Sequence, residues 1–423
     1  MYQTEQKEKA LLVMVEVGKQ IWHPNTLIEE FKNLVASCGI EIVDLVVVKR
    51  KEINPALFIG KGKAEEIAAK VIEKNANVVI FDNNLSFTQQ RNLEDILRIK
   101  TIDRTQLILD IFARHAHSQE GMLQVELAQL KYLLGRLKGK GIMLSRLGGG
   151  IGTRGPGEKK LEVDRRRIVD RIRNLEKKLE EVKKYREIIR KKRKKEKILV
   201  CSLVGYTNAG KSTLFNVLTT ATQKTSDSLF TTLDTVSRSF ILHNNLKIIL
   251  TDTVGFIHNL PPNLIEAFKA TLEELYYADL LLHIIDASSE DIERLKSSTD
   301  TVLADLNLLD KPTLLVFNKI DKINDFEIEA LKNSYIDAIF VSALKKINID
   351  ELKEKIYEFF SKTTTEAILK VPFNIMDLSE YIYKNCEVLK TSYQSTGAVY
   401  FVKARKEKLQ YLQNKGAIIE EIK

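Results

Sequence analysis

The stretch Gly205-Tyr206-Thr207-Asn208-Ala209-Gly210-Lys211-Ser212 constrains the fold of this chain more than any other. It fits the pattern Gly-x-x-x-x-Gly-Lys-Ser of a phosphate-binding loop, and its surroundings fit as well: an apolar run at 198–204 predicts a strand, and the residues from Thr213 predict a helix. A chance glycine-rich turn is disfavoured because both flanking elements are present. The pattern predicts that a nucleoside triphosphate is bound by residues 205–213, without saying which one.

The residue types explain how such a loop works. Gly205 and Gly210 allow backbone torsions that residues with a Cβ avoid, so that successive N–H groups point at phosphate oxygens. The following helix adds the positive end of its dipole. Lys211 supplies a point charge for the β- and γ-phosphates, and the Ser212 hydroxyl is a ligand for Mg²⁺. We therefore expect Mg²⁺ as the cofactor.

Composition excludes several classes of protein. The chain has 423 residues, enough for two to four domains, and its three cysteines lie far apart, so neither a disulfide framework nor a zinc site is expected. The N-terminal residues are too polar for a signal peptide, and no apolar run approaches the roughly 20 residues that span a bilayer. We expect a cytoplasmic, monomeric protein without integral membrane association.

The net charge of +9 is concentrated in one region. Residues 131–197 contain 25 Lys and Arg against nine Asp and Glu, a net charge of +16, which leaves −7 on the rest of the chain. A lysine-rich helix end is often only solvated. A basic region of this size on a mildly acidic protein instead indicates a polyanionic partner such as RNA.

Periodicity divides the chain into four predicted domains. Apolar strands at 11–18, 42–48 and 77–82, with helices between them, predict a small α/β domain at 1–115. Within it, the sequence Gly60-Lys-Gly-Lys63 is interpreted as a turn with exposed lysines. Alternating strands and helices from residue 198 predict a doubly wound, mostly parallel sheet of a phosphate-loop domain at 198–362. Residues 363–423 are predicted to form a small α/β domain, with strands at 368–373 and 397–403 and a helix from about 405.

A helical hairpin is predicted at 116–197, between the N-terminal domain and the phosphate-loop domain. Leucines from Leu123 to Leu137 and apolar residues from Ile168 to Val182 recur at spacings of three and four, which predicts two helices packed along their apolar stripes. The glycine-rich run 138–158 should not sustain a helix and is predicted to be a long tip loop. No aromatic residue occurs there, so contact with RNA phosphates is expected rather than base stacking, through Arg146, Gly148, Gly149, Gly150, Arg154, Lys159 and Lys160.

Four further motifs indicate a guanine nucleotide. Asp252-Thr-Val-Gly255 follows a strand and should bind Mg²⁺ through water and read the γ-phosphate. Asn318-Lys319-Ile320-Asp321 places a carboxylate where it can accept hydrogen bonds from guanine N1–H and the 2-amino group, which adenine lacks. Ser342 and Ala343 should meet the guanine O6, and Thr231 or Thr232 should close over Mg²⁺ and the γ-phosphate, with Thr232 favoured. With Lys211, Thr232 and Gly255 in these roles, the sequence predicts GTP hydrolysis.

The residues in these motifs resemble those of the HflX family of translational GTPases. The resemblance rests on the phosphate loop and Asp252-Thr-Val-Gly-Phe-Ile257, on Ala267-Phe-Lys-Ala-Thr-Leu-Glu-Glu274, and on Asp103-Arg-Thr105 and Gly148-Gly-Gly-Ile-Gly-Thr-Arg-Gly-Pro-Gly-Glu158 upstream. It covers residues 1 to about 360. It implies a stress-related factor that binds the large ribosomal subunit and its RNA, reaches the peptidyl-transferase region with the hairpin tip, and splits stalled or idle ribosomes.

Phe256 stands where Ras-like enzymes carry a glutamine that orients the attacking water. An aromatic residue cannot do so, and the resemblance implies that the family shares it. We therefore expect slow intrinsic hydrolysis that ribosomes stimulate. Two alternatives remain. One is a large-subunit assembly or anti-association factor that does not split ribosomes, and the other is an RNA chaperone or ATP-driven RNA remodeller that acts through the basic hairpin.

Overall fold

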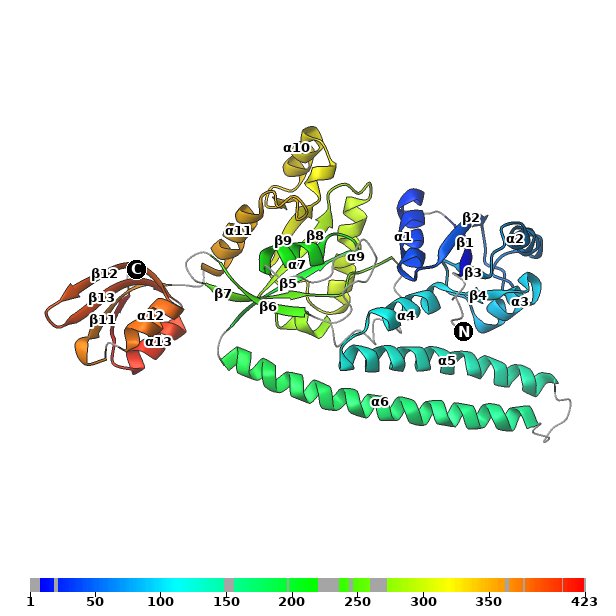
Figure 1. Ribbon diagram of the computed structural model, residues 1–423, viewed down its shortest axis with the longest axis horizontal. Coiled ribbons are helices and arrows are strands. Elements are labelled where there is room, and N and C mark those ends of the chain that lie inside the picture. Colours follow the sequence, from blue (N-terminus) through cyan, green and yellow to red (C-terminus); the bar gives the residue numbers. More distant parts are fainter. Residues whose placement is uncertain are drawn as a thin grey trace, which may run out of the picture.

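The computed structural model describes residues 8–18, 22–147, 156–195, 198–219, 236–242, 246–258, 272–361, 365–375, 377–404 and 406–421. For residues 138–147, 156–161, 189–195, 406–407 and 421 it describes the backbone only. Figure 1 shows three sheets with their helices, and a long helical hairpin that runs alongside the first two.

The N-terminal sheet is parallel and covered on both faces. Its order is β2-β1-β3-β4, formed by Glu41–Arg50, Lys9–Val17, Val78–Phe81 and Lys100–Ile102. Side chains of β1 alternate between two cores, Leu12 and Met14 on one face and Leu11 and Val13 on the other. Helices α1 (Pro24–Ser37) and α4 (Arg104–His115) contribute to the first core, and α2 (Lys61–Glu73) and α3 (Phe87–Leu97) to the second. This two-sided burial explains the continuous apolar run of β1.

The predicted hairpin consists of α5 (Gln119–Leu147) and α6 (Pro156–Lys195). Leu127, Ile172 and Leu175 are buried between the helices, with Leu123, Leu130, Leu134, Ile168 and Leu179 packed around them, so the predicted apolar stripes are confirmed. Charge pairs flank this seam. Arg171 forms two hydrogen bonds with Glu126, of 2.7 and 3.0 Å, and Arg186 lies 2.7 Å from Glu120.

The prediction that 138–158 is non-helical was wrong over most of its length. Helix α5 continues to Leu147, through Gly139 and Gly141, and α6 already begins at Pro156. A glycine inside a helix costs only about 1 kcal/mol relative to alanine, and most of its neighbours here are good helix formers. Proline is favoured in the first helical turn, where its missing N–H has no intrahelical partner.

The next sheet has the order β10-β9-β8-β5-β7-β6. Its strands are Ile339–Phe340, Thr313–Asn318, Leu280–Asp286, Leu199–Gly205, Lys247–Asp252 and Val236–Ile241, and all pairs are parallel except β6 with β7. The sequence did not predict β6, a half-exposed edge strand. Helices α7 (Lys211–Thr219) and α11 (Ile349–Ser361) pack on one face. Helix α9 (Ile292–Asp305) packs on the other, and α10 (Asp325–Ser334) lies near the edge strand β10.

The C-terminal part is a four-stranded antiparallel sheet of order β12-β13-β11-β14, formed by Glu387–Gln394, Gly397–Ala404, Thr365–Pro372 and Ile418–Glu421. Helices α12 (Leu378–Asn385) and α13 (Lys406–Asn414) contribute to its core. The sequence predicted β11, β13 and α13 but neither outer strand. The predicted fold class is therefore confirmed: an α/β chain in which an N-terminal domain and a helical hairpin precede a phosphate-loop domain and a small sheet domain.

Candidate nucleotide site

The phosphate loop lies between the end of β5 and the start of α7. Gly205 has φ +143°, and a Cβ there would lie 2.2 Å from the Ile284 carbonyl oxygen. Gly210 has φ +89°, and its Cβ would lie 2.1 Å from Nδ2 of Asn318. Both positions therefore require glycine for torsion and for space. Asn208 also adopts a left-handed conformation, which asparagine tolerates better than most residues.

Lys211 is the first residue of α7, and its ammonium group is buried inside the loop. Its Nζ donates hydrogen bonds to the carbonyl oxygens of Gly205 and Tyr206, at 3.1 and 2.6 Å. Burial lowers the pKa of Lys211 to about 8, against the opposing effect of Asp252. A phosphate entering the loop would favour the charged form of Lys211, so the site is suited to bind an anion.

The two side chains predicted to serve Mg²⁺ lie next to each other. Ser212 donates its hydroxyl to Oδ2 of Asp252 at 2.7 Å, and Asp252 is fully buried at the end of β7. A hydroxyl and a carboxylate side by side at a helix N-terminus are the hard oxygen donors that Mg²⁺ prefers, completed by phosphate oxygens and water. These residues therefore fit the ion. Thr231 and Thr232, predicted to close over it, lie outside the described residues.

The segment after Asp252 is bound directly to the phosphate loop. Thr207 N–H donates to the Phe256 carbonyl at 2.7 Å, and Phe256 N–H donates to the Gly205 carbonyl at 3.1 Å. Gly255 lies against this loop so closely that a Cβ would come within 2.7 Å of Lys211 Nζ. Gly255 is thus placed beside the group expected to hold the γ-phosphate. The Phe256 side chain is buried in the core with Tyr206 and Leu272, where it cannot contact an attacking water.

The residues predicted for guanine come together at the ends of β9 and β10. Asn318 is buried and joins two loops: its Nδ2 donates to the Ala209 carbonyl at 2.8 Å, and its Oδ1 accepts from Ala343 N–H at 3.0 Å. Ser342 donates its hydroxyl to Oδ1 of Asp321 at 2.5 Å, which fixes the orientation of that carboxylate. The carboxylate and the backbone of 342–343 can thus contact one planar base.

Lys319 has a partner that the sequence did not reveal. Its Nζ lies 2.7 Å from Oδ2 of Asp286, the last residue of β8, and Lys319 itself adopts φ +66°. The ion pair fixes the Lys319 side chain at the edge of the site. The position of Asp286 at the carboxyl end of a strand neighbouring β5 is the signal that could have found it, since ligands in such sheets bind at that edge.

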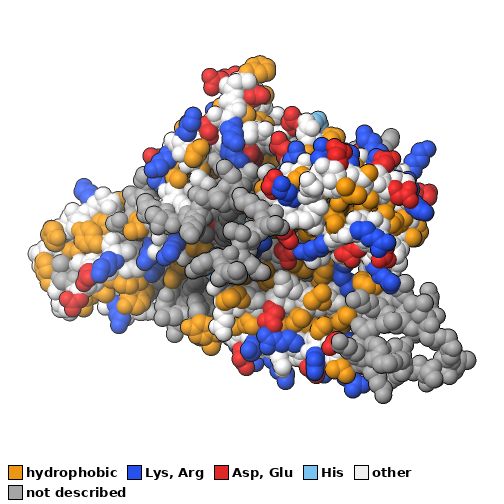
Figure 2. Space-filling model, turned by 45° about the vertical axis from the view of Figure 1, so that its right-hand side comes forward, with side chains coloured by type: hydrophobic (Ala, Val, Ile, Leu, Met, Phe, Trp, Pro, Cys, Tyr) orange, Lys and Arg blue, Asp and Glu red, His pale blue; other side chains and the backbone are white. Residues whose placement is uncertain are grey.

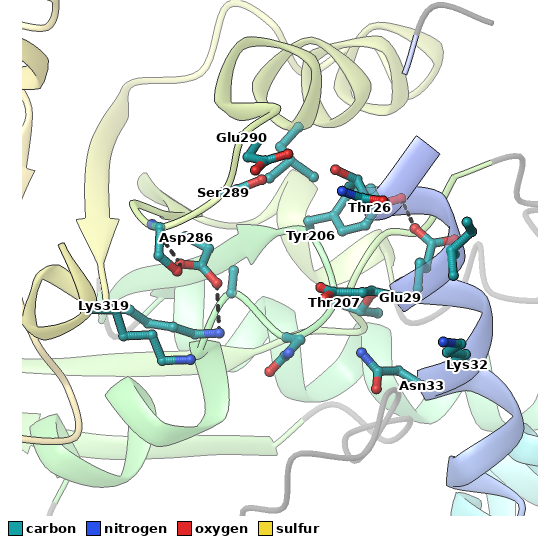
Figure 3. Close-up of a pocket in the computed structure, with 18 residues that line it drawn as sticks. Thr26, Glu29, Lys32, Asn33, Tyr206, Thr207, Asp286, Ser289, Glu290 and Lys319 are labelled. Atoms are coloured by element: carbon teal, nitrogen blue, oxygen red, sulfur yellow. Dashed lines mark hydrogen bonds and ion pairs between the residues drawn. The ribbon is translucent and has the colours of Figure 1, made fainter. Parts of the chain in front are cut away.

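A cavity of about 580 Å³ opens beside these residues. One wall consists of 206–209 of the phosphate loop with Asp286 and Lys319, and the other consists of helix α1 of the N-terminal domain, including Asn25, Thr26, Glu29, Lys32 and Asn33. Figure 3 shows the α1 side chains on one side of Thr207 and the Lys319–Asp286 pair on the other. Sequence reasoning missed this wall because nothing in the motifs predicts which domains touch.

Three of the predicted RNA-binding residues, Arg146, Lys159 and Lys160, lie at the far end of the hairpin. Arg146 belongs to the last turn of α5, and Lys159 and Lys160 to the first turns of α6, where only the backbone is described. Gly148, Gly149, Gly150 and Arg154 lie outside the described residues. On the described part of α6, basic side chains including Arg165, Arg166, Arg167, Arg173, Lys177 and Lys178 are exposed, and Figure 2 shows such side chains along the hairpin. No helix of the described structure is long and apolar enough to cross a membrane.

Comparison with known families matches three successive stretches of this chain. Residues 25–113 match the family described as GTP-binding GTPase N-terminal, residues 115–193 match GTP-binding GTPase Middle Region, and residues 200–319 match 50S ribosome-binding GTPase.

Individual relatives match along most of the chain. The protein named GTPase HflX of Caldanaerobacter subterraneus is 47% identical over 92% of this chain and 90% of its own length. GTPase HflX of Escherichia coli K12 is 43% identical over 88% of each chain. Among solved structures, a GTP-binding protein from Sulfolobus solfataricus in complex with GDP is 27% identical over 84% of this chain and 99% of its own, with a TM-score of 0.44.

Proposed function

This chain belongs to the HflX family of GTPases, and from that membership we propose that it is a GTP-switched translation factor of the cytoplasm that splits stalled or idle ribosomes. It binds the large subunit as a monomer and inserts the hairpin tip, with Arg146, Gly148–Gly150, Arg154, Lys159 and Lys160, near the peptidyl-transferase region. A role in the stress response follows from the same proposal.

The observation that carries this proposal is the direct connection between the hairpin and the nucleotide site. Helix α6 has 40 residues, which corresponds to about 60 Å, and only three residues separate its end from β5, the strand that leads into the phosphate loop. A basic probe of this length, attached to a nucleotide site, suits a factor that reaches into RNA from a switch on the ribosome surface.

Within the site, we propose that each residue acts through the group it presents. The backbone of 205–213 and the Lys211 ammonium hold the phosphates. Ser212, Thr232 and, through water, Asp252 hold Mg²⁺, which would neutralise charge developing on the phosphates. The Thr207 hydroxyl is buried without a hydrogen-bond partner among the described residues, so a nucleotide or its water would satisfy it. Gly255 N–H reads the γ-phosphate, and Asn318, Lys319, Asp321, Ser342 and Ala343 select guanine.

We further propose that the ribosome completes the catalytic site. The Phe256 side chain packs in the core, so it cannot orient the attacking water as the glutamine of Ras-like enzymes does. A group that orients water must therefore come from reordered switch residues or from the ribosome itself. The expected result is slow hydrolysis by the isolated protein and a large increase on adding large subunits. An equal rate with and without subunits would contradict it.

The splitting activity is tested by sucrose-gradient profiles of intact ribosomes. With a non-hydrolysable GTP analogue we expect separate subunit peaks, whereas an assembly or anti-association factor would leave intact ribosomes unchanged. A protein lacking residues 148–155 is the matched control: it should retain intrinsic GTP hydrolysis but no longer separate subunits.

The chemistry of Asp321 offers a second control. The change Asp321→Asn replaces the acceptor for the guanine amino group by a donor, which suits the second carbonyl of xanthine. The variant should therefore split ribosomes with a xanthosine triphosphate analogue and fail with the GTP analogue. If ATP rather than GTP supports ribosome splitting by the unaltered protein, the RNA-remodelling alternative would be favoured.

A further inference from the structure

The N-terminal domain contacts the GTPase domain through a buried cluster of charged groups. Arg104, at the start of α4, pairs with Glu30 of α1 and with Asp82 just after β3. The same guanidinium donates a hydrogen bond to the His258 carbonyl, at 2.8 Å, across the domain boundary. Glu30 in turn accepts a hydrogen bond from the hydroxyl of Tyr206, a residue of the phosphate loop. We call these five residues the interdomain cluster.

Burial makes this cluster sensitive to the loss of any member. Arg104 is 2% exposed and Glu30 is 8% exposed, so one guanidinium balances two carboxylates away from water. Burial raises the pKa of Asp82 to about 6, and Arg104 opposes this rise. The planar guanidinium has five N–H donors in a fixed geometry. Here it binds three separate groups at once: Glu30, Asp82 and the His258 carbonyl. A lysine keeps the charge but cannot hold three partners in this geometry.

The cluster fixes the segment that carries Gly255. Near its middle, Phe256 exchanges backbone hydrogen bonds with the phosphate loop, and at its end Arg104 binds the His258 carbonyl. Gly255 lies between these contacts and Asp252, close to Lys211. The position of Gly255 N–H therefore depends on groups of the N-terminal domain as well as on the GTPase domain.

We propose that Glu30 and Arg104 are positioning residues of the GTPase site, which hold the segment 252–258 ready for the γ-phosphate and let the N-terminal domain distinguish GTP from GDP. The inference rests on the proposed nucleotide ligands. Hydrogen-bond donors that are already in place bind a ligand more tightly, because ordering them costs nothing at the moment of binding. GDP has no group that reaches Gly255, so the advantage applies to GTP alone.

The chain contains its own probe of this contact. Trp22 is the only tryptophan, and its ring centroid lies 6.2 Å from that of Tyr206 and 5.1 Å from that of His258. Indole emission depends on neighbouring rings, so Trp22 should respond when the segment or the loop moves. We expect the emission of the protein to differ between its complexes with GDP and with a non-hydrolysable GTP analogue.

The experiment compares Arg104→Lys with a matched change, Arg136→Lys, on purified full-length protein without ribosomes. Arg136 also pairs with a buried carboxylate, Asp103 at 2.8 Å, but its described contacts lie within the N-terminal domain and hairpin. Both changes should lower the melting temperature. Only Arg104→Lys should weaken binding of the GTP analogue relative to GDP, by about tenfold or more, the scale of one charge-assisted hydrogen bond.

A milder variant keeps the test valid if Arg104→Lys does not fold. Tyr206→Phe removes only the hydroxyl that donates to Glu30, and it should reduce the preference for the GTP analogue in the same direction. In either variant, the difference in Trp22 emission between the two nucleotide complexes should fall to half of the wild-type value or less. An unchanged or increased GTP preference in the folded variant, or identical Trp22 emission in both wild-type complexes, overturns the inference. Neither result depends on whether the protein splits ribosomes.

Discussion

The Asn318 amide joins the phosphate loop to the loop expected to bind guanine. We predict that Asn318→Ala reduces GDP affinity by about thirtyfold, which corresponds to about 2 kcal/mol. The change removes two hydrogen bonds, to the Ala209 carbonyl at 2.8 Å and from Ala343 N–H at 3.0 Å. Each backbone group left buried without a partner costs about 1–3 kcal/mol, so the two together cost about 2–6 kcal/mol.

The loss of these two hydrogen bonds affects nucleotide binding because the nucleotide needs the two loops at a fixed distance from each other. The phosphate loop follows strand β5 and residues 342–343 follow strand β10, and the buried amide holds the two segments at one separation. Without it, the loops can relax apart to hydrate the freed groups. Nucleotide binding must then restore the original spacing, so part of the lost free energy is lost from affinity.

Titration with a fluorescent GDP derivative measures the effect, and Asn348→Gly is the control. Asn348 also donates its side-chain amide to a buried strand carbonyl, that of Phe340 at 2.8 Å, and glycine tolerates its φ of +56°. It touches neither the phosphate loop nor Asp321 in the described contacts. We expect its GDP affinity to stay within about threefold of wild type. Equal affinities for the two variants would refute the argument that Asn318 sets the loop spacing.

Three further changes have defined outcomes. Asp321→Asn should prefer xanthosine over guanosine diphosphate in competition titrations, and retained selectivity for guanine would contradict its proposed pairing. Gly210→Ala should abolish nucleotide binding with little loss of secondary structure, because its Cβ meets Asn318 and its φ is left-handed. Burial lowers the pKa of His283 to about 4, so the folded state resists protonation. The stability that the neutral imidazole contributes is fully present above pH 6.5 and is lost as pH falls. The free energy of unfolding measured in urea should therefore decrease by about 2 kcal/mol from pH 7 to pH 5. This decrease should be absent in His283→Gln.

The parts of the site within single motifs were predictable from the sequence. Glycine is required at 205 and 210 for torsion and space, and lysine and serine at 211 and 212 for charge and a hydroxyl ligand, so spacing alone placed them. The packed stripes of the hairpin were predictable for the same reason, since a spacing of three and four residues fixes one face of a helix.

The remaining features depend on contacts between distant segments. Glu30 carries no local pattern, and Arg104 belongs to the motif Asp103-Arg-Thr105 without any sign of what it binds. The partners of both residues come from other elements and, in Tyr206 and His258, from another domain. The outer strands β6, β12 and β14 were missed because edge strands are stabilised by pairing with one neighbour rather than by burial of a strong apolar pattern.

The base of the hairpin contacts the GTPase domain just beyond the segment that carries Gly255. Lys183 and Arg186 of α6 lie 3.8 and 3.9 Å from Glu273. Helix α6 is therefore connected to the GTPase domain through the chain to β5 and through the ion pairs with Glu273. A movement of Glu273 relative to β5 would tilt the helix. Over the roughly 60 Å of α6, a turn of about 5° displaces the far end by about 5 Å, comparable with the rise of one helical turn. We therefore expect a small shift of the GTPase domain at Glu273 to be amplified at the far end of helix α6.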